Sequence, residues 1–382
     1  MKLAFVTNFC AHYQIKTFET LNSYYDTNYY FFSGGDEWYW QKQLGIRAGN
    51  FNYEYTPGFK LGRTRITPRL PWKLWHGNYD VFIKCINGRF ALPITYLIAR
   101  LRRKPFILWT GIWVKLQKPI HRIFFPITHY IYQHSDAVVV YGEHVKRYLI
   151  SQGVLPERIF IAAHAVDNGI YSRSVLEKEK NILKRELGIK PKQKILLYLG
   201  RLEKIKGLSY LIEAFSLLKR DDSVLVIVGT GSELLSLQRL AEEKGIDEFI
   251  RFVGYVPPEK TVIYYSIAWV CFLPSITLDT GKELWGLVIN ECFNQGVPVI
   301  VTNAVGAAAG GMVKDGINGF VIPEKNSLAL SEVLKKILDE QDLRDYMSRN
   351  AKKIISGWNI EQMVMGFLNA IEYVVKKSTV RI

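Results

Sequence analysis

The amino-acid sequence predicts an α/β protein built from two doubly wound domains, each with its own parallel sheet. Three observations support this fold: the length of 382 residues, an apolar fraction of 48%, and short β-branched or aromatic runs that alternate with helical stretches. A charged fraction of 22% and the lack of low-complexity tracts exclude disordered, collagenous and coiled-coil proteins. Because ligands of doubly wound sheets bind outside the carboxyl ends of the strands, we expect a ligand held between the two halves.

The expected strands fall into two sets, one in each half of the chain. Those of the first half cover residues 3–7, 29–32, 81–84, 105–109, 137–141 and 158–162. Those of the second half cover residues 194–200, 224–229, 250–253, 268–273, 298–302 and 319–322. The polar stretch between the sets, nearly free of strand formers, predicts domains over 1–170 and 191–358 joined by a linker at 171–190. Residues 359–377 predict an amphipathic helix that packs back on the first domain.

The positions of the cysteines and the lengths of the apolar stretches indicate the cellular compartment of the protein. The four cysteines are Cys10, Cys85, Cys271 and Cys292; they lie far apart in sequence, which argues against a disulfide framework and fits a reducing compartment. The apolar run near the start is too short for a signal peptide, and the longest apolar stretches, 90–99 and 264–276, are shorter than a membrane span. We therefore expect a cytoplasmic protein that is soluble or peripheral on a membrane.

Nearly all of the net positive charge comes from the first half of the chain. Residues 1–190 carry 27 Lys and Arg against 13 Asp and Glu, whereas residues 191–382 carry 23 against 22. Within the first half, the stretch 60–104 holds 11 basic residues and one acidic residue, together with Trp72, Trp75 and Tyr79. Cations mixed with Trp and Tyr suit an anionic membrane surface or single-stranded nucleic acid, and an ordinary solvated face remains an alternative.

Two cations in the second half form a candidate anion site. In YLGRLEKIKGLSYLIEAF (198–215) a strand ends at Gly200, and Arg201 and Lys206 precede a helix that starts after Gly207. Cations at the carboxyl end of a strand, beside a helix N-terminus, can bind a diphosphate through charge-assisted hydrogen bonds. Either cation could instead be a surface residue.

Two glutamates form the second candidate. In GKELWGLVINECFNQGVPVI (281–300), Glu283 and Glu291 lie eight positions apart, and Glu291 stands among apolar residues. A carboxylate in such surroundings needs a partner, and ligand hydroxyls would serve because an ionised carboxylate can accept two of them. Gly286 would let backbone N–H groups approach a sugar or a phosphate closely. A capping Glu and a core Glu satisfied by backbone remain the alternative.

Together these segments resemble the second domain of the retaining family 4 glycosyltransferases, which have the GT-B fold of two Rossmann-like domains facing a cleft. The family's glycine-arginine and lysine-glycine pairs match Gly200–Arg201 and Lys206–Gly207, and its Glu-x7-Glu motif matches Glu283 and Glu291. The resemblance continues through VGTGSE (228–233), FVGYVP (252–257), GVPVI (296–300) and DGINGFVIP (315–323), and residues 135–171 resemble the end of the family's first domain.

The resemblance implies a retaining transferase of EC class 2.4 that moves a sugar from a nucleotide-diphosphate donor to an acceptor. Arg201 and Lys206 would hold the diphosphate, Glu291 the ribose hydroxyls and Glu283 the transferred sugar. Backbone N–H groups of Trp285, Gly286 and Leu287 would clamp the sugar phosphate. The domain over 1–170 becomes the acceptor side and that over 191–358 the donor side. No cofactor and no metal are expected, because the cations do the work of a magnesium ion.

The first half departs from the family's pattern. Its first loop, TNFCAHYQIK, lacks a glycine pair, and Thr110 and Gly111 stand where a histidine is common. His12 follows the first strand and is the best acceptor-side candidate among the seven histidines.

The basic first half indicates an anionic or lipid-linked glycan acceptor at the inner membrane surface, as in polysaccharide or glycolipid synthesis. No nucleic-acid partner is expected. Two alternatives stay open: a sugar-nucleotide epimerase on the same fold, and a non-catalytic membrane-binding or nucleic-acid-binding protein.

Overall fold

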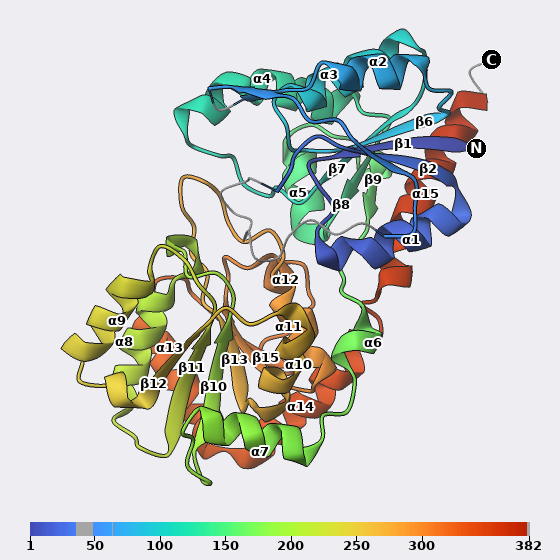
Figure 1. The fold of residues 1–382 in the computed structure, drawn as a ribbon. Coiled ribbons are helices and arrows are strands. Elements are labelled where there is room, and N and C mark those ends of the chain that lie inside the picture. Colours follow the sequence, from blue (N-terminus) through green and yellow to red (C-terminus); the bar gives the residue numbers. More distant parts are fainter. Residues whose placement is uncertain (36–48, 63, 380–382) are drawn as a thin grey trace. The chain divides into compact units, whose positions relative to one another are not determined.

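The computed structural model describes residues 1–35, 49–62 and 64–379, and the chain divides into two compact units. Unit 1 runs from Met1 to His164 and includes the C-terminal segment from Ile360, whereas unit 2 is Ala165–Asn359. The boundary thus lies six residues before the predicted end of the first domain. Residues 171–190 belong to unit 2 and contain a helix, rather than forming a linker. Figure 1 shows the two α/β bodies.

The described part of unit 1 contains a seven-stranded parallel sheet in the order β3-β2-β1-β6-β7-β8-β9. Its strands are β1 (Lys2–Thr7), β2 (Asp26–Phe31), β3 (Tyr53–Tyr55), β6 (Val81–Cys85), β7 (Phe106–Thr110), β8 (Ala137–Val140) and β9 (Ile159–Ile161). The residues of β6, β7 and β8 are all buried, and all of them except Lys84 and Thr110 are apolar, which is why these strands appear in the sequence as short, mainly apolar runs. The edge strand β3 is three residues long and was not predicted.

Helices surround this sheet, and an antiparallel hairpin of β4 (Phe59–Leu61) and β5 (Thr64–Ile66) lies outside it. The described helices of unit 1 are α1 (Ile15–Tyr24), α2 (Arg69–His76), α3 (Ala91–Leu101), α4 (Pro119–His134), α5 (Glu143–Ser151), α15 (Ile360–Thr379) and the 3-10 helices η1 (His12–Gln14) and η3 (Pro156–Arg158). Helix α3 packs between α2 and α4, and the row of three is visible at the top of Figure 1.

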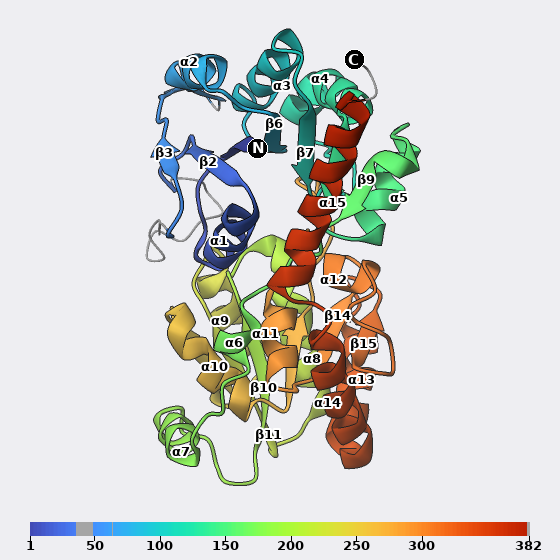
Figure 2. The same ribbon diagram turned by 90° about the vertical axis from the view of Figure 1, so that its right-hand side faces the viewer.

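The C-terminal helix α15 is part of unit 1 and packs against α1, β8 and β9. Figure 2 shows it beside β9. Its buried face repeats every three to four residues, through Met363, Phe367, Ala370 and Val374. At Gly366 the helix lies so close to β9 that a Cβ would stand 2.2 Å from the Ile161 carbonyl oxygen. This contact explains how the last segment of the chain joins the first unit.

Unit 2 contains a six-stranded parallel sheet in the order β12-β11-β10-β13-β14-β15. Its strands are β10 (Lys194–Leu199), β11 (Ser223–Val228), β12 (Ile250–Gly254), β13 (Val270–Leu273), β14 (Val299–Thr302) and β15 (Gly319–Ile322). All six coincide with predicted strands to within two residues. The order places β10 at the centre, where the sheet turns from β11 on one side to β13 on the other, and a doubly wound sheet binds its ligands at this switch point.

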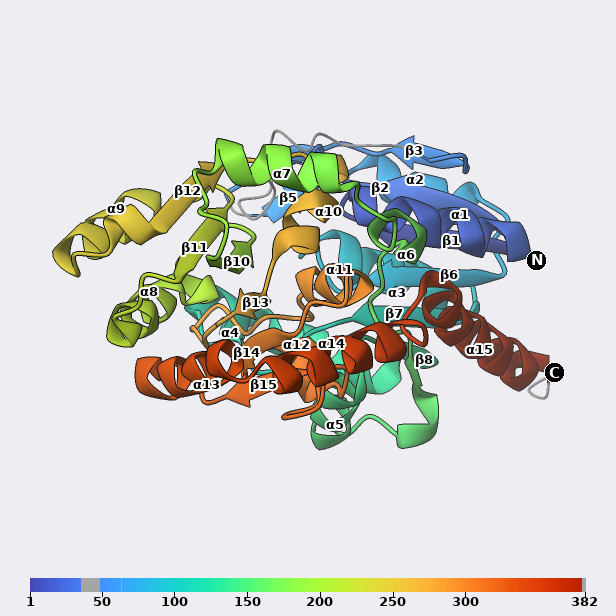
Figure 3. The same cartoon turned by 90° about the horizontal axis from the view of Figure 1, so that it is seen from below.

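Helices lie on both sides of the unit 2 sheet, with α8 and α9 on one side and α10 and α11 on the other (Figure 3). The helices are α6 (Asn168–Tyr171), α7 (Glu177–Glu186), α8 (Leu208–Leu218), α9 (Leu234–Glu243), α10 (Pro258–Ile267), α11 (Val288–Asn294), α12 (Gly306–Ala309), α13 (Ser327–Asp339), α14 (Gln341–Ile355), and the 3-10 helices η4 (Lys204–Lys206) and η5 (Asp247–Phe249).

Two further observations concern the chain as a whole. The four cysteines are buried free thiols. Among the described residues, no helix combines the length and the apolar character that crossing a membrane requires. The predicted position of a ligand between the two halves stays a prediction.

Candidate functional site

The site in unit 2 begins where the central strand β10 ends. The chain leaves β10 through Gly200 and Arg201, forms η4, and enters α8 through Gly207. Gly207 has φ +65°, and a Cβ there would lie 2.1 Å from the carbonyl oxygen of Pro274, the residue that follows β13. Only glycine permits this approach, which brings Lys206 to the carboxyl end of β13.

Lys206 and Glu283 form an ion pair at this edge of the sheet. The Lys206 ammonium contacts Glu283 Oε2, and the Ser275 hydroxyl donates to the same oxygen at 3.3 Å. Both charged side chains are mostly buried, with 13% of Lys206 and 17% of Glu283 exposed. Burial alone would raise the pKa of Glu283, but Lys206 and then Arg201 lower it below the usual value of a glutamate. Glu283 is therefore an ionised acceptor at neutral pH.

The backbone around Glu283 is anchored to the first residues of α12. The backbone carbonyl of Glu283 accepts a hydrogen bond from the Gly306 amide at 3.1 Å, and the Trp285 carbonyl accepts one from the Ala307 amide at 2.9 Å. The Trp285 indole is buried and donates to Asn290 Oδ1 at 3.0 Å. Because the ring is enclosed in the core, Trp285 can reach a ligand only through its backbone.

Gly286 and Leu287 lead into α11. Gly286 has φ +97°, a conformation that favours glycine, and Leu287 is the N-cap of the helix. The first N–H groups of any helix have no acceptor within the helix, and they lie at the positive end of its dipole. The predicted backbone clamp at Trp285, Gly286 and Leu287 leads directly into this helix start and stays a prediction.

Glu291 lies in the first turn of α11 in a different environment from that of Glu283. The Tyr265 hydroxyl donates to Glu291 Oε2 at 2.5 Å, and the Tyr171 hydroxyl is a second hydrogen-bond partner. Burial raises the pKa of Glu291 to about 7, although both tyrosines act in the opposite direction. Glu291 therefore changes its charge near neutral pH.

The structure brings together Lys206 and Glu283, with Arg201 close enough to stabilise the Glu283 carboxylate. Three of these partners were not predicted, because nothing in the spacing of a lone serine or tyrosine indicates that it will contact a glutamate: Ser275, Tyr171 and Tyr265. His12, the acceptor-side candidate, belongs to η1 of unit 1, where its ring lies 5.2 Å from that of Tyr13.

Residues 1–35, 49–62 and 64–379 contain no group of three or more His, Cys, Asp or Glu side chains placed to hold a metal ion.

Comparison with solved structures defines the class of fold. The chain superposes on the HepE protein of Anabaena in complex with UDP with a TM-score of 0.78, over 97% of this chain and 100% of that one, at 17% sequence identity. Two units with Rossmann-like parallel sheets and this overall match define the GT-B fold, as predicted.

A family model matches part of the chain. Residues 179–354, which include Arg201, Lys206, Glu283 and Glu291, match the family model of the glycosyl transferases group 1, so the predicted resemblance is confirmed over this segment.

The sequence matches to two curated relatives extend beyond residues 179–354. The chain is 26% identical to an uncharacterized glycosyltransferase of Methanocaldococcus jannaschii over 245 residues, 64% of this chain and 60% of that protein. It is also 26% identical to the alpha-D-kanosaminyltransferase of Streptomyces kanamyceticus over 282 residues, 71% of each. The match thus spans somewhat over half the length of the M. jannaschii relative.

Proposed function

We propose that the protein is a glycosyltransferase that moves a sugar from a nucleotide-diphosphate sugar to an anionic or lipid-linked glycan acceptor, with retention of the anomeric configuration. The observation that supports this best is the ion pair of Lys206 and Glu283 beside Arg201, at the switch point of a sheet whose segment matches the group 1 family. Polysaccharide or glycolipid synthesis at the cell surface is the process we propose it serves.

The cations act on the leaving group. Arg201 and Lys206 hold the diphosphate and stabilise the negative charge that develops on it as the bond from the anomeric carbon to the phosphate oxygen breaks. Since two fixed cations supply this stabilisation, we propose that transfer needs no metal ion and no cofactor. The acceptor hydroxyl oxygen bonds to the anomeric carbon on the face that the phosphate leaves, and a phosphate oxygen takes its proton.

The glutamates and the backbone bind the rest of the donor. Glu283, already ionised, accepts hydroxyls of the transferred sugar, whereas Glu291 accepts the two ribose hydroxyls in place of its tyrosine partners. The amides of Trp285, Gly286 and Leu287 bind the sugar phosphate.

A thermal-shift panel of UDP, GDP, ADP and their common sugar conjugates tests the donor site. UDP comes first because HepE was solved with UDP and with UDP-glucose. A ligand at one hundred times its dissociation constant adds about 2.7 kcal/mol of stability, which raises the melting temperature by several degrees. We expect one nucleotide to stabilise the wild type and Glu332→Ala, an exposed control on α13, but not Glu291→Ala.

Each other outcome of the panel has a definite meaning. No shift with any nucleotide contradicts the proposal, and tight, salt-dependent binding of RNA without turnover would favour a nucleic-acid-binding protein. Conversion of the bound nucleotide sugar in the absence of any acceptor would identify an epimerase.

The acceptor side points to an anionic membrane surface. Helix α2 buries Leu70 and Leu74 and exposes 59% of Trp72 and 47% of Trp75, with the cation Lys73 between them. Exposed indoles beside cations suit the interface of a bilayer that contains anionic lipids. We propose that the protein is cytoplasmic and peripheral on the inner membrane face, bound through α2, and that it does not act on nucleic acid.

Vesicle binding tests this assignment. The wild type should sediment with vesicles of phosphatidylglycerol and phosphatidylcholine, but not with pure phosphatidylcholine, and salt should weaken the binding. The double variant Trp72→Ser/Trp75→Ser should lose binding, whereas Tyr346→Ser, an exposed aromatic on α14 of unit 2, should keep it. Binding that ignores anionic lipid and salt contradicts the membrane proposal.

A further inference from the structure

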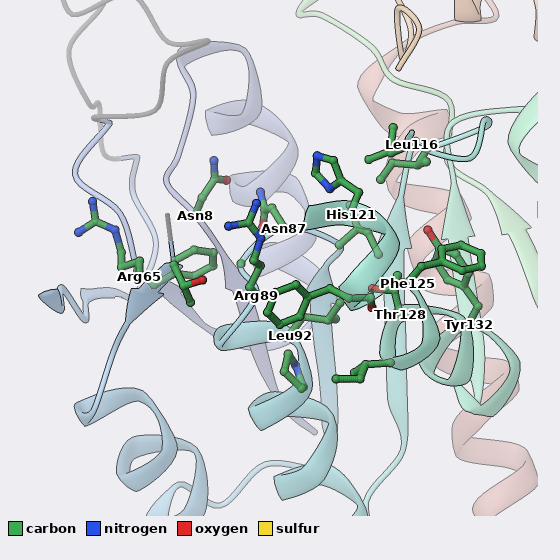
Figure 4. A pocket seen from close by; sticks show the side chains of 18 of the residues that line it. Asn8, Arg65, Asn87, Arg89, Leu92, Leu116, His121, Phe125, Thr128 and Tyr132 are labelled. Carbon is green, nitrogen blue, oxygen red and sulfur yellow. Dashed lines mark hydrogen bonds between the residues drawn. The ribbon is translucent and has the colours of Figure 1, made fainter. Parts of the chain in front are cut away.

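Unit 1 contains a cavity of about 640 Å³ at the carboxyl edge of its sheet, within the size range of small-molecule sites. Asn8, Phe32 and Asn87 line it and follow the strands β1, β2 and β6 respectively. The hairpin of β4 and β5, the first turn of α3, the loop after β7, helix α4 and one residue of α5 complete the wall. Figure 4 shows the polar ends of Asn8, Asn87, Arg89 and His121 gathered on one side of the cavity.

The wall of the cavity combines two chemically different groups of side chains, which we call its cationic part and its apolar part. The cationic part consists of four side chains that can carry positive charge: Lys60, Arg65, Arg89 and His121. The apolar part includes Leu92, Leu116, Phe124, Phe125 and Ile127. Among the described residues that line the cavity, none is acidic.

The cationic part has an electrostatic cost that a bound anion would offset. Burial, and then the positive charges of Arg89 and Lys118, lower the pKa of His121. The Arg89 guanidinium lies 5.7 Å from the centroid of the Phe124 ring, so it marks the junction of the cationic and apolar parts. A negative group in the cavity would therefore meet several cations at once, with an apolar surface beside it.

A buried lysine fixes the conformation of the loop that carries Arg89. Lys84, the fourth residue of β6, is fully buried, and its ammonium donates to the carbonyl oxygens of Cys85 at 2.6 Å and Asn87 at 2.7 Å. The Lys84 ammonium also lies 4.8 Å from the centroid of the Phe32 ring. These bonds hold the loop after β6 in one conformation, so that Asn87 and Arg89 are prearranged for a ligand.

We propose that this cavity binds the phosphate-bearing end of an amphiphile, with Arg65 and Arg89 on the phosphate and the first carbons of the chain along Leu92 and Phe124. The inference rests on the proposed function and deepens it, because it names the acceptor class as a glycan joined to a lipid through phosphate. The same cations could serve a phosphorylated sugar without a lipid, and the two sources differ in whether the apolar part of the wall contributes.

Calorimetric titration of the full chain with three probes separates these sources: dodecyl phosphate and dodecyl maltoside, both below their micellar concentrations, and inorganic phosphate. Dodecyl phosphate should bind at least tenfold more tightly than either of the others. Arg89→Gln and Arg65→Gln should each weaken its binding about tenfold or more. Arg122→Gln, an exposed residue next to His121 that does not line the cavity, should bind it as the wild type does.

Nucleotide binding, measured on the same samples, keeps the two proposals distinguishable. If the nucleotide binds but dodecyl phosphate binds no more tightly than inorganic phosphate, the lipid inference is overturned and the glycosyltransferase proposal stands. Equal binding of dodecyl maltoside and dodecyl phosphate, or full affinity in both Arg89→Gln and Arg65→Gln, also overturns it. If dodecyl phosphate binds as expected and no nucleotide does, the proposed function fails and the lipid-phosphate site stands.

Discussion

The carboxyl edges of the two sheets carry different arrangements of charge. At the carboxyl edge in unit 2, Lys206 pairs with Glu283, and a second carboxylate, Glu291, is held by tyrosines. At the carboxyl edge in unit 1, cations line a partly apolar cavity whose described lining residues include no carboxylate. The first arrangement offers both charges to a ligand that carries phosphates and hydroxyls, and the second offers only positive charge beside an apolar surface.

This difference shows that one architecture sets where ligands bind but not which ligands. Parallel strands end at one edge in both units, which makes that edge the binding place. The residues that follow each strand then decide the chemistry, and these loops differ between the units.

Lys206→Ala should reduce turnover of the nucleotide sugar by about 10²–10³-fold, the usual loss when one stabilising group is removed from a developing negative charge. The change also leaves the buried Glu283 carboxylate without its ion-pair partner. Release of the nucleotide diphosphate measures turnover. Lys204→Ala, an exposed lysine in the same 3-10 helix, should retain wild-type turnover, and equal effects of the two substitutions would contradict a specific role for Lys206.

Gly207→Ala should destabilise unit 2 by about 1–3 kcal/mol more than Gly245→Ala. Both glycines have φ +65°, but only at position 207 would a Cβ meet backbone, 2.1 Å from the Pro274 carbonyl oxygen. Thermal unfolding of both variants provides the measurement. Similar melting temperatures would mean that the close approach of these two loops does not hold Lys206 in place.

The affinity for the nucleotide should fall as the pH drops through 7, by up to about tenfold per pH unit. Glu291, with a pKa of about 7 in the free protein, must lose its proton to accept two ribose hydroxyls, so protonation competes with binding. Glu283, whose pKa is lowered, contributes no such dependence near neutrality. Titration calorimetry between pH 6 and 8 should show the slope in the wild type and a flat profile in Glu291→Gln, and the same slope in both would contradict the assignment.

Lys84→Met should change how stability depends on pH. The pKa of Lys84 is lowered from 10.5 to about 7 by burial, so between these values the unfolded chain binds more protons than the folded one. The Lys84 contribution therefore makes the wild type more stable as the pH rises from 7 to 10, and the variant should lack this gain. Denaturant unfolding at several pH values measures it, with the exposed Lys16→Met as control; identical pH dependence in the wild type and Lys84→Met would refute the prediction.

The sequence was most informative where charge and hydropathy act locally. All twelve predicted strands exist, because buried parallel strands read as continuous apolar runs. The short strand β3 and the hairpin of β4 and β5 were missed, since their residues are half-exposed or exposed and carry little periodic signal.

The site was predictable only in part. The resemblance identified Lys206 and Glu283, whose ion pair joins residues 77 positions apart. It could not give Tyr171 or Tyr265 as partners of Glu291, nor the cavity around Arg89 and His121, because those contacts arise from the packing of distant segments. His12 was chosen for its place after β1, whereas Asn8, in the same loop, lines the cavity.

Hydrogen exchange measured by mass spectrometry tests most directly whether the two edges bind different chemistries. UDP, or whichever nucleotide stabilises the protein, should slow exchange in residues 200–207 and 283–291 and leave 59–62, 64–66 and 85–92 unchanged. Dodecyl phosphate should slow exchange in residues 59–62, 64–66 and 85–92 and leave 200–207 and 283–291 unchanged. Protection of the same segments by both ligands, or of neither region by the nucleotide, would contradict the division of the two ligand chemistries between the units.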